Sequence, residues 1–165
     1  MTKEPERITH PIPPFYNENS KILILGSFPS VKSREQMFFY GHPQNRFWRV
    51  LAGVFEKDVP KSIEEKKTLL DECNVALWDV LAECEILGSA DSTIKNVKAN
   101  DLSKILKTAD IRLVYTNGKT AEKYYNKFLK SKYQVKMISL PSTSPANAAK
   151  SLEKLICEWQ IIKDF

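Results

Sequence analysis

The sequence predicts an α/β protein of three layers, in which a central parallel sheet of about four strands lies between helices. Short apolar runs rich in Val, Ile and Leu, typical of strands buried on both faces, recur along the chain. Segments with apolar residues at helical spacing separate these runs, and such alternation favours parallel pairing. The predicted strands are Lys21–Leu25, Val75–Val80, Ile111–Tyr115 and Gln134–Leu140.

The segments before and between these strands complete the predicted order. Residues 1–20 are rich in proline and predict an extended arm, which we expect to lie on the body through Ile12, Phe15 and Tyr16. The polar stretch from Glu83 to Asn100 predicts a loop.

Helical spacing of apolar residues predicts five helices. In the second of them Ser62 and Glu65 have the spacing of a capping box. The first four are predicted over Asn45–Phe55, Ser62–Cys73, Leu102–Lys107 and Lys119–Lys130, and the last carries Leu152, Leu155, Ile156, Trp159 and Ile162.

The start of the last helix has two interpretations. Ser144 could cap it, with Pro145 at the first helical position, where proline fits well. Alternatively, the hydroxyls and free N–H groups of this stretch could bind a phosphate. The sequence leaves both open.

The composition is that of an ordinary globular protein, with 42% hydrophobic and 27% charged residues. No apolar run approaches the ~20 residues that span a bilayer, and no signal core is visible, so we expect a cytoplasmic protein without membrane contact and a single domain over residues 1–165. Three dispersed cysteines and two histidines predict no disulfide framework and no metal site. A net charge of +5 permits a nucleic acid as partner without requiring one.

Three predicted strand ends carry polar, turn-forming residues, and ligands of open α/β sheets bind at that edge. The first is Gly26–Ser30, in which glycine allows close backbone approach, and the second strand ends at Asp79. The others are Thr116–Gly118 and Pro141–Asn147. A long loop after the first strand brings aromatic residues, and together these features predict a pocket for a flat polar ligand.

Two polar residues of that loop each allow two roles. His42 either fixes the turn before Pro43 or acts as an acid or base. Asn45 stands where a loop meets a helix, and could be a helix cap or a functional amide.

These segments together resemble the uracil-DNA glycosylase superfamily, and most closely its hypoxanthine-DNA (deoxyinosine) glycosylase branch. The resemblance rests on Gly26-Ser-Phe-Pro-Ser30, Gly41-His-Pro-Gln-Asn-Arg-Phe-Trp48 and Pro141-Ser-Thr-Ser-Pro-Ala-Asn147. Two positions depart from the wider superfamily: Phe28 replaces an acidic or amide residue that handles water, and Leu140 replaces a His or Asn. Both departures agree with the hypoxanthine branch, in which the asparagine matching Asn45 supplies the catalytic amide.

The resemblance implies a uracil-DNA glycosylase-like fold and a monomeric enzyme that flips a deaminated base out of DNA and hydrolyses its N-glycosidic bond, without metal or cofactor. It implies that Asn45 orients water and that Tyr40 or Phe39 stacks on the base. The implied base pocket consists of Gly26, Ser27, Phe28, Pro29, Ser30, Phe39, Tyr40, His42 and Asp79. The implied DNA-binding residues are Ser142, Thr143, Ser144, Pro145, Ala146 and Asn147.

Three other hypotheses stay open. The enzyme could act on uracil or on G·U and G·T mismatches. The chain could instead be an α/β module that binds a nucleotide or DNA without catalysis, or a flavodoxin-like binding domain.

Overall fold

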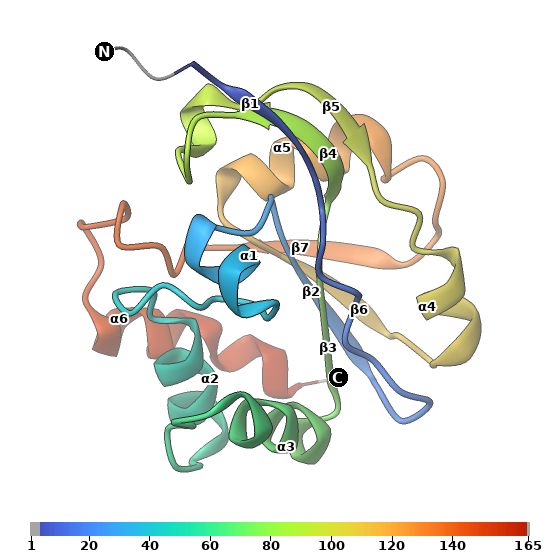
Figure 1. Cartoon of the computed structure of the whole chain (residues 1–165). Coiled ribbons are helices and arrows are strands. Elements are labelled where there is room, and N and C mark those ends of the chain that lie inside the picture. The colour runs from blue at the N-terminus through green and yellow to red at the C-terminus, as the bar shows by residue number, and fades with distance from the viewer. Residues whose placement is uncertain (1–3, 165) are drawn as a thin grey trace.

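The computed structural model describes residues 4–164, at the centre of which lies a parallel sheet with the strand order β3-β2-β6-β7 (Figure 1). Gly26 pairs with Asp79, and Asn117 pairs with Leu140, so the carboxyl ends of the four strands meet at one edge. The predicted parallel sheet is confirmed. The strands are β2 (Ile22–Gly26), β3 (Val75–Asp79), β6 (Leu113–Asn117) and β7 (Lys136–Leu140).

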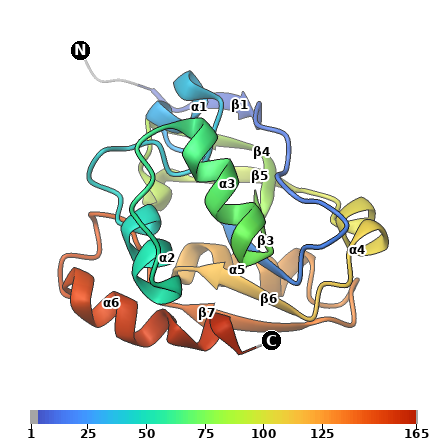
Figure 2. The same ribbon diagram turned by 90° about the horizontal axis from the view of Figure 1, so that it is seen from below.

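Helices cover both faces of this sheet, as predicted, because successive side chains of a strand point to opposite sides. Ile22 and Ile24 pack with one group of helices, and Leu23 and Leu25 pack with the other. Figure 2 shows the first group together on one side of the strands. It consists of α2 (Phe47–Phe55), α3 (Ile63–Cys73) and α6 (Leu152–Glu158), and the second group consists of α4 (Ser103–Thr108) and α5 (Lys119–Phe128).

The prediction of a polar loop over Glu83–Asn100 was wrong. This region forms two strands, β4 (Leu81–Ile86) and β5 (Lys95–Ala99), joined through the short 3-10 helix η1 (Asp91–Thr93). In β4 the buried Cys84 and Ile86 alternate with Glu83 and Glu85, so the strand signal was present but was diluted by charge. These strands pair antiparallel in a separate sheet.

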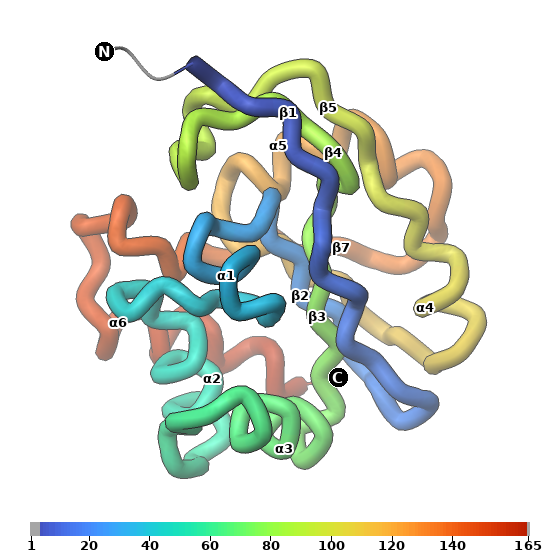
Figure 3. The backbone as a smooth tube through the Cα atoms, viewed as in Figure 1, coloured from blue at the N-terminus to red at the C-terminus, as the bar shows by residue number. Residues whose placement is uncertain are grey.

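The N-terminal arm is extended, as predicted, and it also adds the third strand of that small sheet. Strand β1 (Glu6–Thr9) pairs antiparallel with β4, and Phe15 then pairs with Leu77 of β3. Figure 3 shows the arm as a long blue segment that crosses the molecule before the chain turns into β2. The predicted anchors hold: Ile12 is 2% exposed, and Phe15 and Tyr16 are half-buried against the core.

The last helix begins later than predicted. Helix α6 is capped by the Ser151 side chain, which accepts from the N–H of Lys154, and a 3-10 helix η2 (Trp159–Lys163) follows it. The interpretation of Ser144 as its cap was therefore wrong, because residues 144–147 form a separate turn in which Ser144 accepts from Ala146. The capping box of Ser62 is confirmed by its bond from Glu65 N–H.

One short helix was not predicted. Helix α1 (Val31–Gln36) follows the Gly26–Ser30 turn, and the Ser30 hydroxyl caps it by accepting from Ser33 N–H. Its brevity and its many polar residues gave no apolar periodicity to detect.

Candidate active site

The carboxyl edge of the parallel sheet brings together the three segments that the sequence singled out. Strand β2 ends in the Gly26–Ser30 turn, β6 ends at Asn117, and β7 leads into Pro141–Asn147. Asp79, at the end of β3, is paired with Gly26, whose carbonyl accepts from Val80 N–H at 2.8 Å. The loop that carries Tyr40 and Asn45 lies over the same edge, as the contacts below show.

Asn45 joins this loop to the last segment through its side-chain oxygen. Oδ1 accepts hydrogen bonds from the backbone N–H of Phe47 and from the hydroxyl of Thr143, each at 2.9 Å. Because the Phe47 N–H can only donate, the orientation of the amide is fixed, and Nδ2 has no acceptor among residues 4–164. The N-cap of α2 is Arg46, so the interpretation of Asn45 as the helix cap was wrong. Its oxygen instead accepts from the first N–H of the helix, and the two N–H donors of Nδ2 are left for a ligand.

Asn117 fixes the partner of Asn45, a role that the sequence did not indicate. Its Nδ2 donates to Thr143 Oγ1 at 3.0 Å, and its Oδ1 accepts from Thr143 N–H at 3.0 Å. Thr143 is fully buried, and since its oxygen already accepts from Asn117, its own proton is directed to Asn45. The place of Asn117 at a predicted strand end was the available signal, but nothing in the sequence pairs it with Thr143.

Arg46 ties the loop to the 144–150 turn. Its guanidinium donates to the backbone carbonyls of Ser144 and Asn147, both at 2.9 Å, and to that of Lys150. Its backbone N–H also donates to the Thr143 carbonyl at 3.0 Å. Arg46, which the sequence did not indicate as a functional residue, therefore helps to hold the predicted DNA-binding stretch, together with the hydrogen bonds within that stretch.

Gly26 lies directly beneath two polar side chains. A Cβ atom at Gly26 would lie 2.5 Å from Asp79 Oδ1 and 3.1 Å from the Tyr40 hydroxyl, so only glycine fits. Asp79 is 4% exposed; its Oδ2 accepts from His10 Nε2 at 2.7 Å, and no described residue donates to Oδ1. Oδ1 is therefore a free acceptor at the floor of the site.

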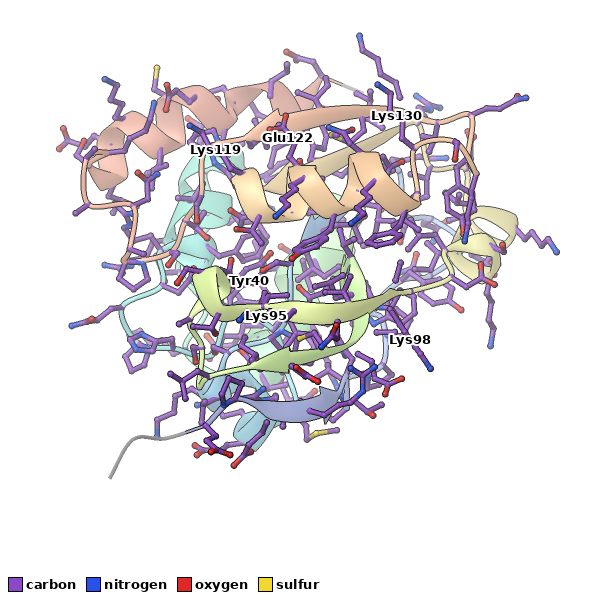
Figure 4. All side chains as sticks on the ribbon, turned by 90° about the horizontal axis from the view of Figure 1, so that it is seen from above. Tyr40, Lys95, Lys98, Lys119, Glu122 and Lys130 are labelled. Carbon is purple, nitrogen blue, oxygen red and sulfur yellow. The ribbon has the colours of Figure 1, made fainter. Side chains whose placement is uncertain are left out.

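Tyr40 stands over this floor with a left-handed backbone, φ +52°. Its ring stacks on Phe47 with centroids 4.1 Å apart, and its buried hydroxyl has no hydrogen-bond partner among the described residues. Burial and the negative charge of Asp79 raise the pKa of Tyr40, so the phenol stays protonated. In the view of Figure 4, Tyr40 lies between α5 and β5, which carry the exposed Lys119 and Lys95.

Ser27 contacts a carboxylate from the small sheet. Its hydroxyl reaches both oxygens of Asp91, at 3.0 and 3.1 Å. Asp91 is exposed as a residue, but partial desolvation of its carboxyl group and the nearby charge of Asp79 raise its pKa. The sequence placed Asp91 in a featureless loop and so missed it.

The other residues predicted for the pocket mainly stabilise the fold, by fixing a turn, capping a helix or packing in the core. His42 Nδ1 accepts from Gln44 N–H at 3.1 Å, which favours its role in fixing the turn. Ser30 caps α1, and Phe39, 2% exposed, packs in the core, so it offers no free face for stacking. Phe28 and Pro29 are buried, Phe28 in an edge contact with His10 at 5.7 Å. Of the two candidate stacking residues, only Tyr40 lies at the site.

Two open surface hollows among the described residues lie away from this edge. One is beside α3, at Lys57 and Glu72, and the other is near Asn100 and Tyr133. The space above Gly26 is filled by Asp79 and Tyr40 instead. The predicted pocket is thus a closed site in this structure.

Residues 4–164 contain neither a cluster of metal-ligating side chains nor a membrane-spanning helix. No group of three His, Cys, Asp or Glu side chains is placed to hold a metal ion. No helix in that range is long and apolar enough to cross a membrane.

Known proteins that are similar to this chain in sequence or in structure all point to one family. The chain is 34% identical over 152 residues to a hypoxanthine DNA glycosylase of Methanosarcina acetivorans, covering 91% of this chain and 94% of the relative. It is also 34% identical, over 149 residues, to a protein of the same name from Methanosarcina barkeri, covering 89% and 92%.

A solved structure agrees with this. An NMR structure of a candidate uracil DNA glycosylase from Methanosarcina acetivorans superimposes with a TM-score of 0.75 at 30% identity, covering 92% of this chain and 96% of the other. The sequence profile of the Uracil DNA glycosylase superfamily matches residues 13–165. With its parallel sheet and its three motifs at one sheet edge, the chain belongs to the uracil-DNA glycosylase superfamily.

Proposed function

We propose that this chain is a DNA repair glycosylase that removes hypoxanthine, the product of adenine deamination, and leaves an abasic site. The observation that carries the proposal is the Asn45 amide, held by Thr143 with its nitrogen free, at the sheet edge that also holds Gly26. The two archaeal relatives named hypoxanthine DNA glycosylase support this choice of base. We expect the protein to act on DNA as a monomer in the cytoplasm.

The N-glycosidic bond cannot be reached inside the base stack, so the nucleotide must be flipped into the site. Flipping costs a few kcal/mol, and less for a poorly paired base such as hypoxanthine opposite thymine. The Gly26–Ser30 backbone then lines the floor, and the face of Tyr40 opposite Phe47 receives the purine ring. Because Tyr40 covers Gly26 in the closed site, it must shift as the base enters.

Asn45 works in this proposal by position rather than as a base. A neutral amide is a poor proton acceptor, and its oxygen is already occupied by two donors. One Nδ2–H group donates to the oxygen of the attacking water and holds it near the sugar carbon. The other lone pair of that oxygen forms the new C–O bond as the N-glycosidic bond breaks, and the proton that the water loses passes to the departing base or to solvent. Positioning of the water, together with stabilisation of the departing base, supplies most of the rate.

Asp79 reads the edge of the flipped base. The N1–H of hypoxanthine donates a hydrogen bond to the free Oδ1 of Asp79. In adenine, N1 carries a lone pair instead, which a carboxylate repels. The protonated phenol of Tyr40 adds no negative charge beside it. Uracil has a similar N–H beside a carbonyl, so this contact alone leaves uracil as the alternative base.

The 142–147 stretch grips the backbone of the duplex through phosphate contacts. Ser142 and Ser144 offer partly exposed hydroxyls, whereas the Thr143 hydroxyl is buried and already bonded to Asn45 and Asn117. The turn through Pro145, Ala146 and Asn147 fills the space left by the flipped nucleotide. Such contacts carry little sequence information. Because they are made to charged phosphates, we expect DNA binding to weaken as the salt concentration rises.

Replacing Arg46 by alanine is expected to weaken duplex binding by about 10- to 100-fold, because three loop carbonyls lose a charged donor. The measurement is fluorescence anisotropy with duplexes of two unrelated sequences at fixed salt. Arg49→Ala, which removes the same charge from an exposed position of α2, is the control and should change affinity little. Equal losses in both variants would mean that charge matters and loop geometry does not.

A panel of oligonucleotides tests the function itself. Duplexes with one inosine, uracil, xanthine or G·T mismatch are incubated with the protein, and abasic sites are cleaved with alkali. We expect strand cleavage at inosine, fastest opposite thymine. Preferred cleavage at uracil or the mismatch would establish the alternative substrate, and DNA binding without any cleavage would indicate a non-catalytic module.

A further inference from the structure

His10 is a buried titratable group that the proposed reaction does not use. It comes from the N-terminal arm, just after β1, and its side chain is 3% exposed. Its Nε2 lies 2.7 Å from Asp79 Oδ2, at the floor of the site and 69 positions away in the chain. A polar side chain so deeply buried beside a pocket carboxylate calls for a role.

The hydrogen bonds of the ring determine where its proton is. Nδ1 accepts from the backbone N–H of Ile12 at 3.2 Å, so this nitrogen carries no proton. A neutral imidazole must then bear its proton on Nε2, which donates to Asp79. The bond therefore exists without a charge on His10, and the carboxylate receives a fixed donor on one oxygen only.

The ring itself cannot turn. His10 meets Phe28 and Trp78 in edge contacts, with centroids 5.7 and 6.2 Å away, and Phe39 lies 6.4 Å away. The backbone N–H of His10 donates to the Ala82 carbonyl at 2.8 Å, which anchors the arm to β4. The donor on Asp79 is thus held by packing as well as by hydrogen bonds.

We propose that His10 is a positioning residue for base recognition. By holding Oδ2, it directs the other oxygen of Asp79, Oδ1, over Gly26 as the acceptor for the N–H of the flipped base. The inference rests on the proposed glycosylase function and adds that the N-terminal arm completes the base site. It assigns to the arm a part in selectivity, beyond its contribution to the fold.

The test measures single-turnover excision of hypoxanthine by His10→Leu, which keeps the volume but removes the donor, and by His10→Gln. The Gln amide can again donate to Asp79. We expect about a 10- to 100-fold loss in His10→Leu, the equivalent of one hydrogen bond to a charged group. His10→Gln should recover most of it. Arg7→Ala, which removes the arm's contacts with Glu83 and Asn96, is the matched control and should excise normally.

A double variant separates positioning from mere folding. If His10 acts through Asp79, His10→Leu should cost almost nothing further in an Asp79→Asn background. Additive losses, no rescue by glutamine, or losses that follow the melting temperatures across all variants would overturn the proposal. Normal excision by His10→Leu would overturn it too, while leaving the glycosylase function intact. A wild-type protein that cleaves none of the four substrates would instead overturn the function, and the proposal with it.

Discussion

Asn45→Ala is expected to reduce excision of hypoxanthine by about 100- to 1,000-fold, the usual effect of deleting one well-placed donor in an active site. Duplex binding should change little, because the phosphate contacts are made elsewhere. The measurement is single-turnover cleavage of an inosine duplex beside its dissociation constant. Gln44→Ala, which removes an exposed amide next to it, is the control.

Asn45→Asp tells which end of the amide acts. An aspartate can still accept from Phe47 N–H and from the Thr143 hydroxyl, so both hydrogen bonds of the side-chain oxygen are kept, but the Nδ2 donors are gone. We expect this variant to be as inactive as Asn45→Ala. An active aspartate variant would show that the group accepts a proton from water, and the donor role would have to be abandoned.

The same substitutions differ in stability. Asn45→Ala loses the bond from Phe47 N–H, the first N–H of α2, and loss of one such hydrogen bond costs about 0.5–1.5 kcal/mol. Asn45→Asp keeps that bond and should unfold close to the wild-type midpoint. Thermal denaturation of the pair therefore shows how much of an activity loss comes from folding.

Gly26→Ala is expected to reduce excision by about 100-fold, since a displacement near 1 Å at a reacting centre costs about that much. The added methyl group would lie 2.5 Å from Asp79 Oδ1. Asp79 cannot move aside without breaking its 2.7 Å bond to His10, so β2 or the base must shift. Excision of inosine under single-turnover conditions measures the effect.

Gly88→Ala serves as its control. The methyl group there meets nothing within 4 Å, although the positive φ of +59° makes alanine strained. It should lower stability modestly and leave excision unchanged. If Gly26→Ala also retained full activity, the base could not bind over this glycine.

The four parallel strands could be predicted because each is a short apolar run with polar ends. Cys84 and Ile86 show the opposite case: their alternation with glutamates is real, but over so few residues it looks like a polar loop. For that reason the small antiparallel sheet was not predicted from the sequence. Ser144 was mistaken for a cap because serine before proline suits both a helix start and an isolated turn.

The site was predictable where it depends on strand ends and was not where it depends on contacts distant in sequence. Gly26 and Asp79 follow apolar runs, and parallel pairing brings them to one edge. His10 lies 69 positions from its partner, and Asn117 lies 26 from Thr143, distances over which a single sequence gives no pairing signal.

The base site also draws on both ends of the chain, with His10 near the start and Thr143 near the finish. Thr143 follows Asn45 by 98 positions, so during synthesis Asn45 meets its partner late. Strand β2 likewise pairs with β6 only after the intervening chain has been made. A shortened product without residues 141–147 would leave the Asn45 oxygen without its Thr143 donor. Truncation before this segment should therefore remove the arrangement that we propose for excision.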